Sequence, residues 1–224
     1  MSFGDKKLSE IAVSVPGSTS LLREYDLDFC CGGSDTLANA AAEKGLNLAE
    51  IETRLTELQN SKAENPEEYW VNATYPEIID HILVRYHQRH REQLQELIVL
   101  ADRVESVHGD REDCPIGVAA ELRNVYEDLS NHMMKEEHVL FPMIKAGNYM
   151  MAQMPIRMME MEHAEHGEHL DVLKSLTNNM TPPVDACNTW RALYSGIQEF
   201  ADDLMMHIHR ENNILFPRVI AENH

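Results

Sequence analysis

The stretch His132-Met-Met-Lys-Glu-Glu-His-Val-Leu-Phe-Pro142 decides the fold, because it returns as His207-Ile-His-Arg-Glu-Asn-Asn-Ile-Leu-Phe-Pro217, 75 residues further along (132 to 207). In both copies a histidine precedes a glutamate by four residues. This spacing puts the two side chains one turn apart on the same helix face, from which both can bind one metal ion. Leu, Phe and Pro follow at identical spacing in each copy.

A second pattern, H-x-x-H-x-E-x-L, repeats with almost the same offset. It covers residues 87–94 and 163–170, which are 76 positions apart (87 to 163). Each copy therefore holds two helical elements, and neither hairpin can bury its apolar face alone. No segment shows the period-two alternation of a strand, so we expect an all-α protein in which the two hairpins pair as an antiparallel four-helix bundle.

Start and stop signals place the helices of this bundle. We expect them at about 74–107, 116–145, 155–176 and 184–221, with a capping box at Thr74 and Glu77 and a stop at Gly147. Pro142 and Pro217 are expected to bend their helices. Residues 60–69 are polar and are interpreted as a linker. The prediction is a small helical domain over residues 1–65 and the bundle over residues 70–224.

The recurring positions supply six candidate metal ligands. Six are too many for one tetrahedral zinc ion but suit two adjacent metal ions, each taking two imidazoles, with bridging carboxylates and open positions for a small molecule. The hardness of these ligands favours iron or manganese. The candidates are His87, His132, Glu136, His163, His207 and Glu211.

Two further histidines, His90 and His166, also repeat and are alternative ligands, although we favour a supporting or surface position for both. Asp128 and Glu162 are candidates for moving protons near the ligands, although we favour the simpler interpretation that both are solvated. Methionines at helical spacing usually fill a core, and this is our expectation for Met150, Met151, Met154, Met158, Met159 and Met161.

Net charge and apolar content exclude some partners. The chain has 19 basic and 38 acidic side chains, a net charge of −19, which opposes binding to nucleic acid or to an anionic membrane. No apolar run approaches the roughly 20 residues of a membrane helix, and the start lacks the pattern of a secretory signal. We therefore expect a cytoplasmic protein. A homodimer stays open.

Cys30 and Cys31 are adjacent and precede Gly32 and Gly33. A flexible, accessible dithiol that holds iron, sulfur or a partner's thiol is the favoured interpretation, and a buried structural pair is the alternative. The carboxylates of Asp26 and Asp28 are expected to raise the thiol pKa.

With these residues in view, the chain resembles the iron-sulfur cluster repair family, ScdA-type proteins with a hemerythrin-like main domain. The resemblance rests on residues 28–33, on His87 and its surroundings, on residues 132–137 and on residues 211–217. It implies the same six ligands, with Glu136 and Glu211 bridging two irons. It also implies repair of iron-sulfur clusters damaged by nitrosative or oxidative stress. Asp128 departs from the glutamate expected in close relatives.

Three functions start from such a site. The first is repair of damaged iron-sulfur proteins by iron donation, assisted by the dithiol. The second is an enzyme that reduces nitric oxide to nitrous oxide, and the third is a sensor or carrier of dioxygen or nitric oxide. The dithiol favours repair, and whether the protein is an enzyme stays open at this point.

Overall fold

The computed structural model describes residues 2–61 and 63–222 and divides into two compact units. One unit comprises Met1–Ile78 with Met206–His224, and the other comprises Ile79–Met205. The described residues are helical, and the β pairing among them is a single isolated antiparallel bridge between Lys7 and Thr36. The all-α prediction is confirmed.

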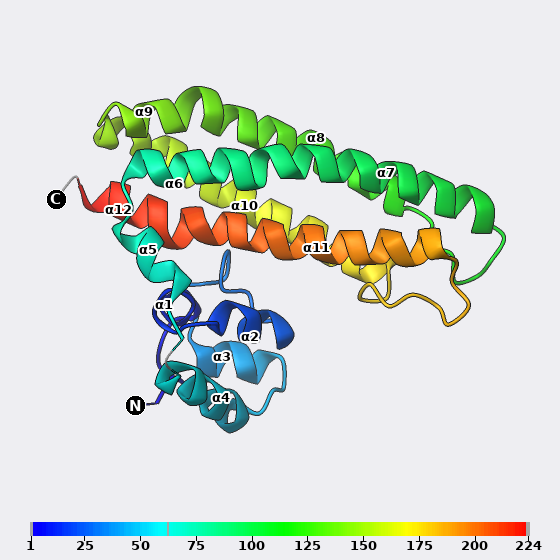
Figure 1. Cartoon of the computed structure of the whole chain (residues 1–224), viewed down its shortest axis with the longest axis horizontal. Coiled ribbons are helices and arrows are strands. Elements are labelled where there is room, and N and C mark those ends of the chain that lie inside the picture. The colour runs from blue at the N-terminus through cyan, green and yellow to red at the C-terminus, as the bar shows by residue number, and fades with distance from the viewer. Residues whose placement is uncertain (1, 62, 223–224) are drawn as a thin grey trace. The chain divides into compact units, whose positions relative to one another are not determined.

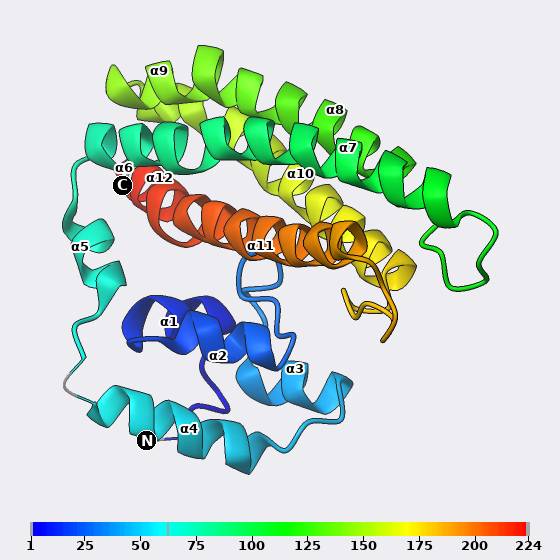
Figure 2. The same cartoon turned by 45° about the vertical axis from the view of Figure 1, so that its right-hand side comes forward.

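The Ile79–Met205 unit is the four-helix bundle, whose long helices run side by side in Figures 1 and 2. Two of these long helices are interrupted by π-helical turns, which are labelled η. In chain order its elements are α6 (Tyr75–Ile82) from Ile79 onward, η1 (Leu83–His87), α7 (Gln88–His108), α8 (Val118–Lys135), η2 (Glu136–Leu140), α9 (Phe141–Lys145), α10 (Tyr149–Leu176) and α11 (Asn188–Arg210) as far as Met205.

Apolar side chains from each rod close the bundle core, among them Leu94, Leu122, Ile156 and Phe200, each at most 1% exposed. α7 and α11 approach closely at Gly196, where an added Cβ would lie 2.6 Å from Leu97 Cδ2. A larger residue there would require the Leu97 side chain to move.

The predicted helix boundaries are confirmed at some ends and wrong at others. The capping box forms, because the Thr74 backbone N–H donates to Glu77 Oε2 at 2.8 Å. Gly147 ends the second rod in the left-handed conformation, with φ of 75°. α10 begins at Tyr149, before the expected start at Pro155, because the helix tolerates a proline in its second turn. α11 begins at Asn188, later than the expected start at 184.

The other unit has its own apolar core, built from side chains such as Phe3, Leu22, Phe29, Ile51 and Phe216, none more than 1% exposed. The segment interpreted as a linker contains a capped helix, since Asn65 Oδ1 accepts the backbone N–H of Glu67 at 3.2 Å. The elements are α1 (Leu8–Ser14), α2 (Ser18–Glu24), α3 (Leu37–Glu43), α4 (Leu48–Asn60), α5 (Pro66–Asn72), η3 (Glu211–Leu215) and α12 (Phe216–Ala221).

The expectation for the methionine group is wrong for five of its six members. The buried face of α10 carries Ala152, Ile156, Met159 and His163. The other methionines lie off that face and are between 50% and 76% exposed; they are Met150, Met151, Met154, Met158 and Met161.

No helix in the described part of the chain combines the length and apolar character needed to span a membrane.

Candidate metal centre

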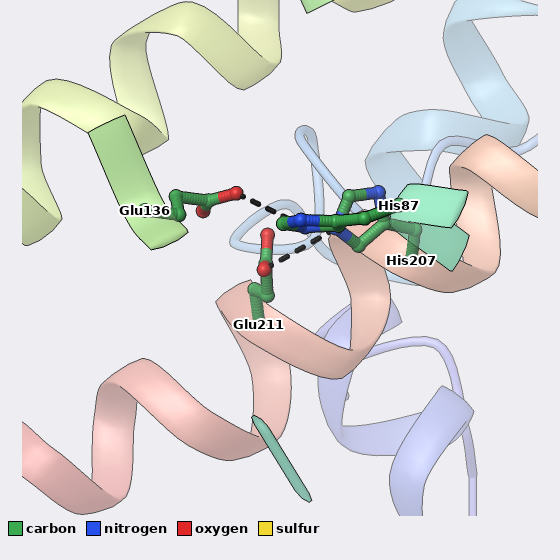
Figure 3. Close-up of side chains that lie close together, drawn as sticks. All are labelled: His87, Glu136, His207 and Glu211. Carbon is green, nitrogen blue, oxygen red and sulfur yellow. Dashed lines mark ion pairs between the residues drawn. The ribbon is translucent and has the colours of Figure 1, made fainter. Parts of the chain in front are cut away.

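In the bundle, the His87 and Glu136 side chains meet in the core, both essentially unexposed. His87 Nε2 lies 3.3 Å from Glu136 Oε2 (Figure 3). The opposite ring nitrogen, Nδ1, donates to Glu137 Oε1 at 2.8 Å, and Arg91 donates to the same oxygen at 2.7 Å. The hydrogen bond from His87, followed by that from Arg91, lowers the pKa of Glu137 to about 2 against its partial burial. Glu137 thus fixes the His87 ring with Nε2 facing Glu136.

His132 is held by a second arrangement of the same kind. Its Nδ1 donates to Glu162 Oε2 at 2.9 Å, and Lys135 donates to the other Glu162 oxygen at 2.5 Å. The hydrogen bond from His132, followed by that from Lys135, lowers the pKa of Glu162 to about 2 against partial burial. The opposite edge of the ring faces His163, with the two Nε2 atoms 3.1 Å apart. His132 Nε2 also lies 3.5 Å from Glu136 Oε2.

Glu136 therefore faces two of the predicted histidine ligands, His87 and His132. One of its oxygens lies within 3.5 Å of the Nε2 atoms of His87 and His132. Ligand atoms of His132, Glu136 and His163 all lie within 4.8 Å of one another, and the three residues are buried. A buried carboxylate beside inward-facing imidazoles fits a metal ion, which would offset the cost of burying these polar groups.

In the other unit, His207 and Glu211 form the pair predicted from the second copy. His207 Nε2 lies 3.3 Å from Glu211 Oε1, and both side chains are at most 1% exposed (Figure 3). The predicted geometry of a His and a Glu one turn apart is thus present in both copies.

Each of three π-helical turns has a candidate ligand at one end. η1 ends at His87, η2 begins at Glu136, and η3 begins at Glu211. A proline stands at the start of the α-helix after η2 and after η3, where it lacks the N–H that would continue the α-helical ladder. Such turns are frequent at functional sites. The sequence predicted bends at Pro142 and Pro217, and the structure places a π-turn directly before each.

His90 and His166 are buried, so the surface interpretation is wrong for both. His90 packs edge-on against Phe200, with ring centroids 5.4 Å apart, and His166 packs against His132 at 4.8 Å. Asp128 is directed to the surface, where it lies 3.1 Å from His169 Nε2.

Sequence reasoning missed the structural roles of three acidic residues around the ligands. Glu137 orients His87, and Glu162, considered only for proton transfer, orients His132. The third, Glu67, is 6% exposed and pairs with Arg210 and with His209, whose Nε2 lies 3.5 Å away. Although burial raises the pKa of Glu67, hydrogen bonds and charge from His209 and Arg210 lower it overall. The sequence signal for Glu137 and Glu162 is that each directly follows or precedes a candidate ligand.

The dithiol is less exposed than expected. Cys30 is 6% exposed and Cys31 is half-buried. The hydrogen bond with Cys31, burial and the nearby charge of Asp28 raise the pKa of the Cys30 thiol well above its ordinary range. The predicted direction of the Asp28 effect is confirmed for Cys30.

Two family models match this chain and show which class of protein it is. Residues 78–219 match the hemerythrin HHE cation binding domain, and residues 4–59 match ScdA_N, described as a domain of unknown function. The main part of the chain is therefore a hemerythrin-like cation-binding domain, and its buried His and Glu side chains fit a metal site.

Relatives that match nearly the full length of the chain identify the family within this class of proteins. The chain is 68% identical to a probable iron-sulfur cluster repair protein of Haemophilus influenzae, over 99% of this chain and 100% of the relative. It is 54% identical to the iron-sulfur cluster repair protein YtfE of Musicola paradisiaca, over 98% of each chain, and 54% identical to that of Citrobacter koseri, over 99% of each. The chain belongs to the iron-sulfur cluster repair family.

Proposed function

We propose that this protein repairs damaged iron-sulfur clusters by donating iron from a site for two iron ions. The ligands are the six candidates, His87, His132, His163, His207, Glu136 and Glu211, with both glutamates bridging. The observation that carries the proposal is the position of Glu136, whose Oε2 lies 3.3 Å from one histidine and 3.5 Å from another. One carboxylate is thereby available to two metal ions, and the repeat assigns the same role to Glu211.

Iron bound there supplies exchangeable ferrous ions and open coordination positions. The protein residues hold the ligands in place: Glu137 and Glu162 keep the Nδ1 proton on their histidines, so that Nε2 presents its lone pair. The acceptors are damaged iron-sulfur proteins, as the names of the relatives indicate, and the expected compartment is the cytoplasm. Its thiol buffers would keep Cys30 and Cys31 reduced.

Nitric oxide reduction needs protons as well as a metal pair. Of the two carboxylates considered for that task, Glu162 accepts hydrogen bonds from His132 and Lys135, and Asp128 is engaged by His169. These contacts favour iron donation, with nitric oxide or dioxygen as small ligands of the same metal ions.

The test is anaerobic transfer. Iron-loaded protein is mixed with an iron-sulfur enzyme whose cluster has been damaged by nitric oxide, and the acceptor's cluster absorption and activity are followed. We expect recovery with the wild type and none with the Glu136→Ala, Glu211→Ala variant loaded in the same way. Iron that stays on the wild type, with catalytic formation of nitrous oxide, would favour the enzyme instead.

A further inference from the structure

The segment between α2 and α3 brings two thiols and a carboxylate together. Asp28 accepts the backbone N–H groups of Cys30, Cys31 and Gly32 at 3.0, 2.9 and 2.8 Å, which ties the turn around its own side chain. The Sγ atoms of the two cysteines lie 3.8 Å apart, and Cys30 Sγ lies 3.1 Å from Asp28 Oδ1. One ligand atom from each of the three residues lies within 4.8 Å of the other two.

The turn has no room for a side chain at Gly33, two residues after Cys31. An added Cβ on Gly33 would lie 2.5 Å from the Phe29 carbonyl oxygen and 3.0 Å from Ser9 Cβ. The Gly33 carbonyl also accepts the backbone N–H of Ser9 at 3.0 Å, which joins the turn to α1. The dithiol is therefore held in place and does not sit on a flexible tail.

The distance between the two sulfur atoms matches one coordination geometry of a bound metal ion. The two sulfurs are in contact as unbonded thiols, since a disulfide has about 2.05 Å between its sulfurs. A tetrahedral ion with metal–sulfur bonds of about 2.3 Å separates two sulfur ligands by about 3.8 Å. A linear two-coordinate ion with bonds of that length would need about 4.6 Å. The separation of 3.8 Å thus fits a tetrahedral divalent ion.

The same turn is bonded to the segment that carries Glu211. Asn212, the next residue, donates from Nδ2 to the Cys30 carbonyl at 3.0 Å, and Asn213 donates to the Phe29 carbonyl at 2.8 Å. The thiols and a proposed iron ligand therefore belong to one hydrogen-bonded arrangement within one unit of the protein.

We propose that Asp28, Cys30 and Cys31 form a second metal site, for a divalent ion that accepts thiolate ligands, such as Fe²⁺ or Zn²⁺. In the proposed repair function, on which this role rests, the site receives ferrous iron on its way to an acceptor. Binding forms two metal–sulfur bonds, releases the two thiol protons to water and leaves the oxidation state of the ion unchanged. The exposed Asp28 and half-buried Cys31 leave the ion open to exchange.

Cobalt(II) is the probe, because Co²⁺–thiolate bonds give a near-ultraviolet charge-transfer band that imidazole and carboxylate ligands do not. Full-length reduced protein is titrated without oxygen. We expect one thiolate-bound Co²⁺ per chain, with the band lost in Cys30→Ser and in Cys31→Ser. Cys114→Ser and Cys187→Ser are the matched controls and keep it. A wild-type protein without the band, or a band indifferent to Cys30 and Cys31, would mean that the thiols contact only each other and would overturn the proposal.

Two further variants separate this site from the iron site. Glu136→Ala with Glu211→Ala should lose iron but retain the thiolate band, so failure at one site is not mistaken for failure at the other. Asp28→Asn keeps an oxygen for the backbone N–H groups of Cys30 and Cys31, loses the oxygen that accepts the Gly32 N–H, and removes the charge. We expect Co²⁺ affinity to fall about tenfold. An unchanged affinity would restrict Asp28 to shaping the turn and would contradict its place among the ligands.

Discussion

The two copies of the ligand motif have the same backbone and different neighbours. Glu136 begins η2 in the bundle and Glu211 begins η3 in the other unit, and each stands four residues after a histidine at a distance of 3.5 or 3.3 Å. The residues that follow the two glutamates make different contacts. Glu137 orients His87, whereas Asn212 holds the carbonyl of Cys30.

The residue before each glutamate differs as well. Lys135 pairs with Glu162 and keeps half of its side chain exposed, whereas Arg210 is 4% exposed and pairs with the buried Glu67. The duplicated segment thus keeps the candidate metal ligands, while the adjoining positions have acquired different partners. In the first copy those positions serve the metal site, and in the second they serve the dithiol turn and α5.

The largest expected effect is on bound iron. Because the two glutamates are equivalent in the repeat, Glu136→Ala and Glu211→Ala should each lower iron affinity by at least about 100-fold, beyond what the loss of a supporting residue costs. Metal analysis and Mössbauer spectra of protein purified without oxygen measure this, with the exposed Glu165→Ala as control. If either variant still binds two coupled irons, the glutamate replaced in it is not required for iron binding, and the two copies are not equivalent.

The residues before the glutamates should differ in stability. Arg210→Ala leaves the Glu67 carboxylate buried without its guanidinium and should lower the free energy of unfolding by about 3 kcal/mol. The matched change Lys135→Ala removes a half-exposed partner and should cost less than about 1 kcal/mol. Urea unfolding of the metal-free proteins measures both, and equal costs would contradict the contrast between the copies.

The next effect concerns the orientation of a ligand. Glu137→Ala removes the acceptor of the His87 Nδ1 hydrogen bond and should weaken iron binding about tenfold. Competition with a chelator of known affinity provides the measurement. Arg91→Ala, which removes the second donor to Glu137 and retains the carboxylate, should have a smaller effect. If both variants bind iron as the wild type does, His87 does not depend on this carboxylate.

Features encoded at fixed spacing along the chain could be predicted from the sequence. The all-α bundle and the His–Glu pairs at 132 and 207 follow from the repeat, because a helix converts a spacing of four into a shared face. The capping box at Thr74 is encoded within four residues.

Features that depend on packing between distant residues could not be predicted. Glu162 meets His132 from 30 residues away, and Glu67 meets Arg210 from 143 residues away. The π-turns depend on how each rod packs, with only Pro142 and Pro217 as a local signal. The methionine group misled for a related reason: helical spacing defines a face, but packing decides whether that face is covered.

The smallest change is expected at Asn212, the residue that follows the glutamate in the second copy. Asn212→Ala removes one hydrogen bond to the dithiol turn, which should loosen the turn by about 1 kcal/mol and leave iron content unchanged, unlike Glu137→Ala at the equivalent position. Hydrogen exchange of the Cys30 and Cys31 amides should accelerate about fivefold. Asn72→Ala, which removes an exposed hydrogen bond within α5, is the control. Loss of iron from Asn212→Ala would show that the second copy also uses this position to support its metal ligands, and the two copies would then differ in the partner alone.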